Sequence, residues 1–316
     1  MKVLLTGYSG FLGRHLARAL KKNGFQVRVL LHRRTVTRKE FGDEADEVLW
    51  GSVTDRSLIR KAVDGVDAVV HAAWTFSPLF SNRPTVNEAG TTLLLEESIQ
   101  SGVDVFAFIS SVAVYGMTPH SIEPVAESSQ RATGKDLLFL YPSEKIACED
   151  MLRSNGRKGL RLAIFRPGPI FNDQKGPMKK RISIVGHSFS LGIGNGKNHM
   201  GYIHAEDVSE AVAKWLMKGK DGDIFNVTPS VHLSHREWHR RWAGVKDLQM
   251  DPLFIPEALM RLAGSSLRIL MRCMGKEMKQ DLNYAILSAT RDIQYSNEAL
   301  RRSLGWEDEA TARYTR

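Results

Sequence analysis

A tyrosine and a lysine stand four residues apart in the segment Tyr141-Pro142-Ser143-Glu144-Lys145. On a helix this spacing places both side chains on one face. A free phenol has a pKa of about 10 and is a poor base at neutral pH. A nearby ammonium favours the phenolate and lowers that pKa. The pair could therefore act as a general acid or base toward a carbonyl or an alcohol.

A serine could complete this pair. Ser111 follows the apolar run Val105–Ile109 after one residue, so it lies at the carboxyl end of an expected strand. Open α/β sheets present their ligand-binding groups at the carboxyl ends of the strands. Ser111 could donate a hydrogen bond to the same substrate oxygen as Tyr141. We therefore predict that Ser111, Tyr141 and Lys145 are the catalytic residues.

A glycine-rich segment near the N-terminus reads Thr6-Gly7-Tyr8-Ser9-Gly10-Phe11-Leu12-Gly13. Gly7 permits a tight turn, Gly10 lets the backbone approach a pyrophosphate, and Gly13 lets the next helix pack closely on the strand. The N-terminus of that helix offers free N–H groups to an anion. A tight strand-to-helix turn without a ligand is the alternative. Because the segment opens a strand–helix pattern, we predict that residues 7–13 bind a dinucleotide.

The elements that position these groups alternate through the first 170 residues. Apolar runs predict strands, and amphipathic spacing predicts helices. The strands are expected at 3–5, 27–31, 68–71, 105–109 and 162–165, and the helices at 11–22, 55–63, 87–101 and 142–154. This alternation predicts an α/β fold with a doubly wound parallel Rossmann sheet. We expect a dinucleotide-binding domain over 1–170 and a smaller, mainly substrate-binding domain over 171–316, with 206–230 returning to the first domain.

The second expected strand ends in His32-Arg33-Arg34, where sites that prefer NAD usually carry an acid. Guanidinium groups there suit a 2′-phosphate. Residues 1–40 hold ten Lys/Arg and one acid, whereas the rest of the chain is balanced. We predict that His32, Arg33 and Arg34 bind NADP(H), with NAD(H) as the second choice and a solvated basic loop as the alternative. A nucleic-acid partner is not expected, because its basic surface would spread along a face or tail.

Composition narrows the class of protein further. The chain has 316 residues, of which 42% are hydrophobic and 25% charged, as in ordinary globular proteins. No apolar run approaches the roughly 18 residues of a membrane span, and the first strand begins too early for a signal peptide. The two cysteines, Cys148 and Cys273, make no disulfide framework. We expect a cytoplasmic protein.

Together these motifs resemble the extended short-chain dehydrogenase/reductase family, the NAD(P)-dependent epimerase/dehydratase group, over nearly the whole chain. Further matching segments are Gly51–Asp55, His71–Ala73, Asn87–Thr91, Ser110–Gly116, Arg166–Gly168, Tyr202–Val208 and Leu304–Trp306. The resemblance implies that Ser111, Tyr141 and Lys145 form a catalytic triad in which Lys145 also holds the cofactor ribose. It places Val53 beside the adenine, Ala72 and Ala73 beside the ribose, and Pro167 and Ile170 beside the nicotinamide. The other cofactor contacts that we expect are Ser52, Trp74 and Gly168.

One segment distinguishes branches of this family. Nucleotide-sugar members carry Arg-Asp where this chain has Met200-Gly201, and a thioether cannot neutralise a phosphate. Residues 166–171 look more like dihydroflavonol and 3β-hydroxysteroid reductases. Lys197 and His199 could compensate for the missing arginine. We expect a small, partly apolar substrate in contact with Trp74, Phe76, Val112, Phe171 and Met200, although Phe76 and Phe171 could equally belong to the core.

Three hypotheses follow. The first is an NADP(H)-dependent oxidoreductase that reduces a carbonyl or oxidises an alcohol of a small molecule. The second is a nucleotide-sugar epimerase or dehydratase that retains its cofactor. The third, a non-catalytic NADP(H) sensor, is the least favoured because Tyr141 and Lys145 are both present. The resemblance also implies a homodimer formed through residues 87–101 and 142–154.

Other groups are assigned to packing. His232, His235 and His239 have a spacing that a metal could use, but the resemblance needs no metal, and we expect none. Cys148 is expected to be a core residue. Residues 257–280 are amphipathic and could form a substrate lid or a membrane-surface helix. We favour an ordinary helix that caps the substrate domain, without membrane contact.

Overall fold

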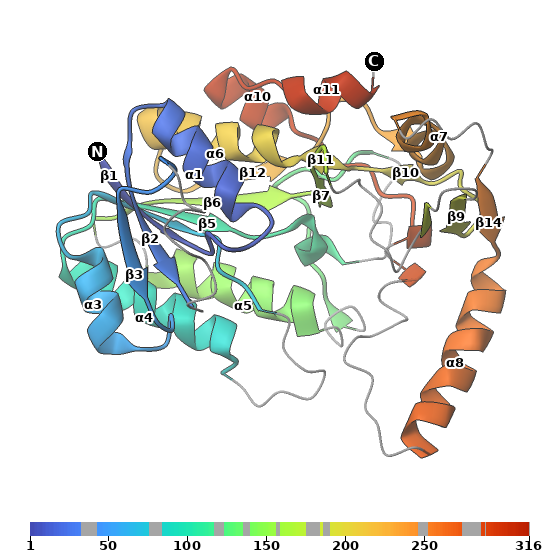
Figure 1. Ribbon diagram of the computed structural model, residues 1–316, viewed down its shortest axis with the longest axis horizontal. Helices are drawn as coiled ribbons and strands as arrows, with labels where there is room; N and C mark the ends of the chain where they lie inside the picture. The colour runs from blue at the N-terminus through green and yellow to red at the C-terminus, as the bar shows by residue number, and fades with distance from the viewer. Residues whose placement is uncertain are drawn as a thin grey trace.

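The computed structural model describes residues 1–32, 43–75, 84–116, 123–134, 140–155, 159–174, 184–185, 190–245, 252–273, 286–287 and 289–315. Its centre is a seven-stranded sheet in the order β12-β6-β5-β4-β1-β2-β3 (Figure 1). The strands are β1 (Lys2–Thr6), β2 (Gln26–Leu31), β3 (Glu47–Trp50), β4 (Ala68–His71), β5 (Val105–Ile109), β6 (Arg161–Pro167) and β12 (Asp223–Val227). Every pairing within this sheet is parallel.

Helices cover both faces of the sheet. One face carries α1 (Gly13–Lys22) and α6 (Ala205–Lys218), and the other carries α3 (Arg56–Val63), α4 (Val86–Gln100) and α5 (Leu140–Asn155) (Figure 1). Alternate residues of β1 point to opposite faces, so Val3 and Leu5 join one core cluster and Leu4 joins the other. The predicted doubly wound Rossmann fold is therefore confirmed.

The edge strand β3 was not among the expected strands. All four of its residues are half-buried. Its sequence, Glu-Val-Leu-Trp, shows neither the alternating pattern nor the fully apolar run that predicts a strand. Glu47 instead forms ion pairs with Lys2 of β1 and Arg28 of β2, at 2.5 and 2.6 Å. Contacts to neighbouring strands stabilise β3, and a local pattern does not reveal them.

The C-terminal part of the chain is built from small elements. Short strands form three minor sheets: β10 (His199–Met200) with β13 (Leu233–Ser234), β11 (Ile203–His204) with β7 (Ile170–Phe171), and β14 (Leu253–Ile255) with β9 (Ser190–Ile193) and β8 (Ile184–Val185). The helices are α7 (His235–Val245), α8 (Glu257–Cys273), α10 (Glu298–Leu304) and α11 (Glu309–Thr315). Helix α8 extends away from the body of the molecule (Figure 1). No helix within the described residues combines the length and apolarity that crossing a membrane requires.

The last helices return to the Rossmann sheet. Helices α10 and α11 pack against α6, and β12 pairs with β6. Trp306 donates its indole N–H to the carbonyl oxygen of Asp207 at 2.9 Å. The Asp207 carboxylate in turn accepts hydrogen bonds from the backbone N–H groups of Ala310 and Thr311. Residues from both halves of the chain therefore share one core.

The strand order reverses between β1 and β4, because β2 follows β1 on one side and β5 follows β4 on the other. In open α/β sheets, ligands bind in the crevice outside the carboxyl ends of the strands at such a point. Thr6 ends β1 and His71 ends β4. The candidate site should therefore lie around Gly7 and Ala72.

Candidate active site

The glycine turn lies at this crevice. Gly7 has φ +80°, and a Cβ there would lie 2.5 Å from the backbone nitrogen of Ala73. A Cβ on Gly13 would lie 2.1 Å from the carbonyl oxygen of Gly7. A Cβ on Gly10 would meet only that same oxygen, at 3.0 Å, and Gly10 is exposed. Two glycines therefore permit close backbone packing, and Gly10 leaves the outer side of the turn open for a ligand.

The start of α1 suits an anion. No side chain among the described residues caps this helix at Leu12, and its first turn contains no acid. Its first N–H groups therefore remain available, and the helix dipole favours negative charge there. Ser9 and Gly10 are exposed beside this end. The turn and the helix start thus have groups that could bind the pyrophosphate of a dinucleotide, and binding by residues 7–13 stays a prediction.

Not every side chain of the turn faces outward. The Tyr8 ring is fully buried in the core, and its hydroxyl donates to Oε2 of Glu44 at 2.6 Å. Leu12 is also a core residue. Any cofactor contact from these two positions would therefore come from the backbone. Phe11 is partly buried against the same cluster.

The other expected cofactor residues surround the turn. His32 is exposed at the end of β2, whereas Arg33 and Arg34 lie outside the described residues. The backbone N–H of Ala73 donates to Oγ1 of Thr6 at 3.2 Å, which holds the residues after β4 beside the turn. Ala72 lies next to Gly7.

Two further candidates follow β3, which is the neighbour of β2. Val53 packs closely against α4, since a Cβ on Gly90 would lie 2.6 Å from its Cγ2. Ser52 exchanges a hydrogen bond with Thr54 at 2.7 Å. The expected adenine neighbours therefore have a defined position relative to α4.

The three predicted catalytic residues come together beyond the end of β5. Ser111 caps the 3₁₀ turn η1 (Val112–Tyr115), accepting the N–H of Ala113 at 3.2 Å. Tyr141 and Lys145 share one face of α5, and Tyr141 is hydrogen-bonded to Ser111. Lys145 Nζ is buried and donates to the carbonyl oxygen of Ile109 at 2.8 Å.

The charge state of this group differs from the expectation in one respect. We expected the Lys145 ammonium, together with an oxidised nicotinamide, to lower the pKa of Tyr141, and the structure contains the lysine alone. Burial instead raises the pKa of Tyr141, and the hydrogen bond with Ser111 only partly opposes this rise. The Lys145 ammonium is held by the Ile109 carbonyl and lies over the Trp74 ring. Burial also lowers the pKa of Lys145 to about 7. Because its own pKa is raised, Tyr141 is a neutral proton donor in the ligand-free protein.

Residues 3–228 match the model of the NAD dependent epimerase/dehydratase family. The chain belongs to this family. It is therefore an NAD(P)-dependent oxidoreductase of the epimerase/dehydratase type, which confirms the family and the enzyme class expected from the motifs.

Three relatives illustrate the range of the family. The uncharacterized protein y4nG of Sinorhizobium fredii is 29% identical over 222 residues, and the match covers 68% of this chain but only 54% of that protein. The decarboxylating sterol-4-alpha-carboxylate 3-dehydrogenase of Dictyostelium discoideum is 26% identical, with 75% of this chain and 74% of that protein covered. The 4-hydroxy-2-methyl-3-oxo-4-farnesyl-3,4-dihydroquinoline-1-oxide ketoreductase of Stigmatella aurantiaca is 23% identical, with 98% and 93% covered.

Solved structures share the fold. The Thermus thermophilus UDP-glucose 4-epimerase, solved in complex with NAD, superposes with a TM-score of 0.72 at 21% identity. The superposition covers 98% of this chain and 94% of that one. It extends beyond residues 3–228 of the family match into the C-terminal part of the chain.

A buried hydrogen-bonded chain lies beneath the cofactor crevice of this family member. Oγ1 of Thr6 lies 2.7 Å from Nδ1 of His71, and Nε2 of His71 lies 3.0 Å from Oγ1 of Thr91. Burial lowers the pKa of His71 to about 3, and the Lys145 charge acts in the same direction. His71 is therefore neutral, and it ties β1, β4 and α4 together below the site.

A second set of contacts holds α5 in place, and the sequence did not single it out. Oδ1 of Asn87 accepts the N–H of Thr75 at 3.0 Å, and Nδ2 of Asn87 donates to the carbonyl oxygen of Thr75 at 2.8 Å. The same amide nitrogen donates to Oε1 of the buried Glu144 at 3.0 Å. The motif Asn87-x-x-Gly90-Thr91 was noticed, but its connection to α5 is a long-range contact that spacing does not predict.

A third network supports the serine. Ser110 donates to Oε1 of Glu149 at 2.6 Å, and Arg166 donates to both oxygens of Glu149, at 2.9 and 2.6 Å. Tyr115 accepts a further hydrogen bond from Arg166 at 2.8 Å. All four side chains are buried. The loop that carries Ser111 is therefore fixed to α5 and β6 by a charged, fully buried cluster.

The expected substrate contacts are less uniform. Phe171 and Met200 are buried in one core cluster with Tyr202 and Trp238. This placement favours the packing interpretation of Phe171 over substrate contact. Val112 is buried next to Ser111, and Phe76 lies outside the described residues. Trp74 has its ring against both Tyr141 and Lys145.

The strand after β6 places the expected nicotinamide neighbours. A Cβ on Gly168 would lie 2.1 Å from the carbonyl oxygen of Gly201, so this position requires glycine. Pro167 ends β6, and Ile170 is partly buried where β7 pairs with β11. These residues connect the Rossmann sheet to the minor sheets at its carboxyl edge.

The histidines and the cysteine have packing positions. His235 and His239 are fully buried with ring centroids 4.8 Å apart, whereas His232 accepts the N–H of Tyr295 at 3.4 Å. Within the described part of the chain, no group of three or more His, Cys, Asp or Glu residues could hold a metal ion. Burial raises the pKa of Cys148 to about 11, which leaves its thiol protonated and unreactive.

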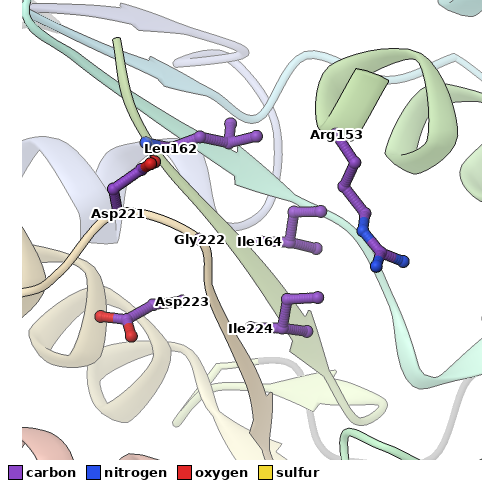
Figure 2. A pocket seen from close by; sticks show the side chains of 7 residues that line it. All are labelled: Arg153, Leu162, Ile164, Asp221, Gly222, Asp223 and Ile224. Carbon is purple, nitrogen blue, oxygen red and sulfur yellow. Dashed lines mark hydrogen bonds between the residues drawn. The ribbon is translucent and has the colours of Figure 1, made fainter. Parts of the chain in front are cut away.

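A surface hollow of about 130 Å³ lies away from these groups. It is lined by Arg153 of α5, by Leu162 and Ile164 of β6, and by residues 221–224 around the start of β12 (Figure 2). Leu162 and Asp223 stand near the amino ends of their strands. The candidate active site lies at the opposite, carboxyl edge of the sheet, so this hollow has no part in the chemistry.

Proposed function

We propose that this protein is an NADP(H)-dependent oxidoreductase that reduces a carbonyl, or oxidises an alcohol, of a small and partly apolar substrate. The observation that carries the proposal is the meeting of Ser111, Tyr141 and Lys145 beyond β5, at the same sheet edge as the glycine turn. Groups suited to proton transfer and to dinucleotide binding therefore lie at the same carboxyl edge of the sheet.

The side chains divide the work of carbonyl reduction. A bound nicotinamide supplies the hydride. Tyr141 donates the proton to the carbonyl oxygen, because burial raises its pKa and keeps the phenol protonated. Ser111 is hydrogen-bonded to Tyr141 and orients the same substrate oxygen. Lys145, whose pKa burial lowers to about 7, would hold the ribose of a bound cofactor, and its protonated form would place positive charge beside Tyr141.

NADP(H) preference rests on the end of β2. Val27–Leu31 contains no acid, and the exposed His32 leads into Arg33 and Arg34. A 2′-phosphate would gain charge-assisted hydrogen bonds from these side chains. NAD(H) remains the second choice.

The segment around Met200 supports a substrate without a diphosphate. Met200 is only 5% exposed and packs in the core, so it offers nothing to an anion. His199 lies 3.1 Å from Asp292, whose carboxylate would repel a phosphate. The names of two relatives, a sterol dehydrogenase and a ketoreductase of a farnesylated quinoline, point the same way. We infer an alicyclic or aromatic ketone or alcohol with an apolar body.

A nucleotide-sugar epimerase or dehydratase is the second candidate, because the fold is shared with a UDP-glucose 4-epimerase. Lys197 is exposed near Met200 and could bind a phosphate. A non-catalytic sensor is the least favoured, since Tyr141 and Lys145 are in place.

We further propose a cytoplasmic homodimer that pairs α4 and α5 with their copies. Light scattering coupled to size-exclusion chromatography would measure its mass.

A direct test is NADPH oxidation with a panel of uncharged alicyclic and aromatic ketones. The wild-type protein should consume NADPH in proportion to the ketone added, and the cofactor should exchange freely with solution. A cofactor that co-purifies and is used only catalytically would favour the epimerase or dehydratase. A protein that binds NADPH but turns over neither substrate class would favour the sensor.

A further inference from the structure

Trp74 stands two residues beyond Ala72, on the strand end that faces the glycine turn. Nζ of Lys145 lies 3.3 Å from the centroid of its ring, directly over the π face. The Tyr141 ring meets the indole edge-on, with centroids 6.1 Å apart and an interplanar angle of 90°. Trp74 is therefore in contact with two of the three proposed catalytic residues.

The indole N–H of Trp74 is buried, yet it has no hydrogen-bond partner in the described structure. Two fully buried tryptophans of this chain, Trp306 and Trp215, do have a partner. Trp306 donates to the Asp207 carbonyl oxygen at 2.9 Å, and Trp215 donates to Oδ2 of Asp223 at 3.0 Å. Buried donors are rarely left unpaired, because burial removes their hydrogen bonds to water. Trp74 thus carries an unused donor at the site.

Contacts on the ring of Trp74 and on the backbone after it set the position of the N–H. Lys145 covers one face, and Phe108 packs nearby with centroids 6.4 Å apart. The next residue, Thr75, has its backbone N–H and carbonyl both bound by the Asn87 side chain. The N–H therefore has a fixed position beside Tyr141 and Lys145 before any ligand arrives.

We propose that Trp74 is a ligand-binding residue whose Nε1–H donates a hydrogen bond to an acceptor oxygen of the molecule held beside Tyr141 and Lys145. This inference rests on the proposed function of the site. The acceptor is a hydroxyl, carbonyl or carboxamide oxygen, and it belongs either to the substrate or to the cofactor. Ligands without such an oxygen at this point bind less tightly.

The test compares Trp74→Phe with Trp306→Phe. Each variant removes one buried indole N–H and retains an aromatic ring, but within the described residues only the N–H of Trp306 has a partner. Urea denaturation of the ligand-free proteins should show a lower midpoint for Trp306→Phe. Trp74→Phe should keep the wild-type midpoint or exceed it, because it removes an unsatisfied donor. A midpoint lowered as much as that of Trp306→Phe would overturn the proposal, whatever reaction the protein catalyses.

Binding then identifies the source of the acceptor. Calorimetric titration with NADPH measures the cofactor, and KM for the best ketone measures the substrate. Trp74→Phe should raise either the NADPH Kd or the ketone KM by roughly threefold to tenfold, which corresponds to the loss of one hydrogen bond. Trp306→Phe should leave both constants unchanged. A change in the NADPH Kd assigns the acceptor to the cofactor, and a change in KM alone assigns it to the substrate. If Trp74→Phe matches the wild type in both, the inference is wrong. A wild-type protein that binds NADPH but reduces no ketone contradicts the proposed reaction, and the midpoints still decide the role of Trp74.

Discussion

Nδ2 of Asn87 on α4 lies 3.0 Å from Oε1 of Glu144 on α5, and both side chains are buried. Glu144 immediately precedes Lys145, and Asn87 also binds the backbone of Thr75, next to Trp74. One amide thereby joins the chain after β4, at the proposed cofactor crevice, to α5, which carries the proposed catalytic residues Tyr141 and Lys145. Changes at this contact should therefore affect stability and catalysis together.

The substitution Asn87→Asp tests this contact. It places two carboxylates side by side in a buried site, which raises the pKa of one of them. The variant should be less stable than the wild type by roughly 1–3 kcal/mol at pH 8. The folded variant then binds an extra proton, so this deficit should shrink as the pH falls from 8 to 5. Asn155→Asp, at the exposed end of α5, is the control for urea denaturation and should show no such dependence.

Tyr141→Phe should abolish turnover without loss of the fold. The variant keeps the ring against Trp74 and loses only the hydroxyl that donates the proton. Its kcat should fall by about 10²–10⁴-fold, while calorimetry should show NADPH binding close to wild type. Tyr314→Phe removes a remote tyrosine hydroxyl on α11 and should retain activity. Turnover by Tyr141→Phe at the wild-type rate would exclude the proposed proton donor.

Replacing Arg33 and Arg34 by alanine should weaken NADPH selectively. Each charge-assisted hydrogen bond lost to the 2′-phosphate should cost about 1.5–3 kcal/mol, and NADH binding should change little. The double variant Lys22→Ala/Lys61→Ala removes the same charge from exposed helix positions and controls for the general field of the protein. Equal affinities of the wild type for NADPH and NADH would refute the preference.

The buried histidines of α7 should make the protein sensitive to acid. Burial lowers the pKa of His235 to about 4 and that of His239 to about 3, from ordinary values of about 6.5. Between pH 6.5 and 4 the unfolded chain binds protons that the folded protein does not, so stability falls as the pH drops. Within this window, each histidine should lower the free energy of unfolding by about 1.4 kcal/mol for every pH unit of acidification.

Denaturation midpoints measured from pH 7 to 5 check this slope. His235→Leu should make it shallower by the contribution of one proton. Trp242→Phe changes a buried residue of the same helix without removing a titrating group, and it should leave the slope unaltered. An unchanged slope in His235→Leu would show that protonation of His235 does not limit stability in acid.

Nucleotide-sugars should bind weakly to the cofactor-loaded protein. Met200 supplies no charge, and loss of an arginine–phosphate contact costs roughly 1.5–3 kcal/mol. Titration with UDP- and GDP-sugars should therefore give affinities weaker than those for uncharged ketones. Lys197→Ala should weaken nucleotide-sugar binding only if Lys197 replaces the missing arginine. Micromolar affinity that depends on Lys197 would promote the epimerase candidate.

Local patterns predicted much of this protein. The glycine turn, the strands that precede it and follow it, and the four-residue spacing of Tyr141 and Lys145 all follow from short-range geometry, because helix and strand periods repeat within a few residues. The end of β5 also indicated Ser111. The basic end of β2 led to a cofactor preference, but two of its residues lie outside the described structure. The family comparison then confirmed the fold and the enzyme class.

Tertiary packing decided the remainder. The sequence by itself determined which residues could do chemistry, because backbone period and residue type are local properties. Whether Trp74 covers Lys145, whether Asn87 reaches Glu144, and whether Met200 faces a ligand or the core depend on segments distant in the chain. Desolvation likewise depends on everything packed around a group, which is why burial raises the pKa of Tyr141 in the ligand-free protein, an effect that the spacing of Tyr141 and Lys145 does not reveal.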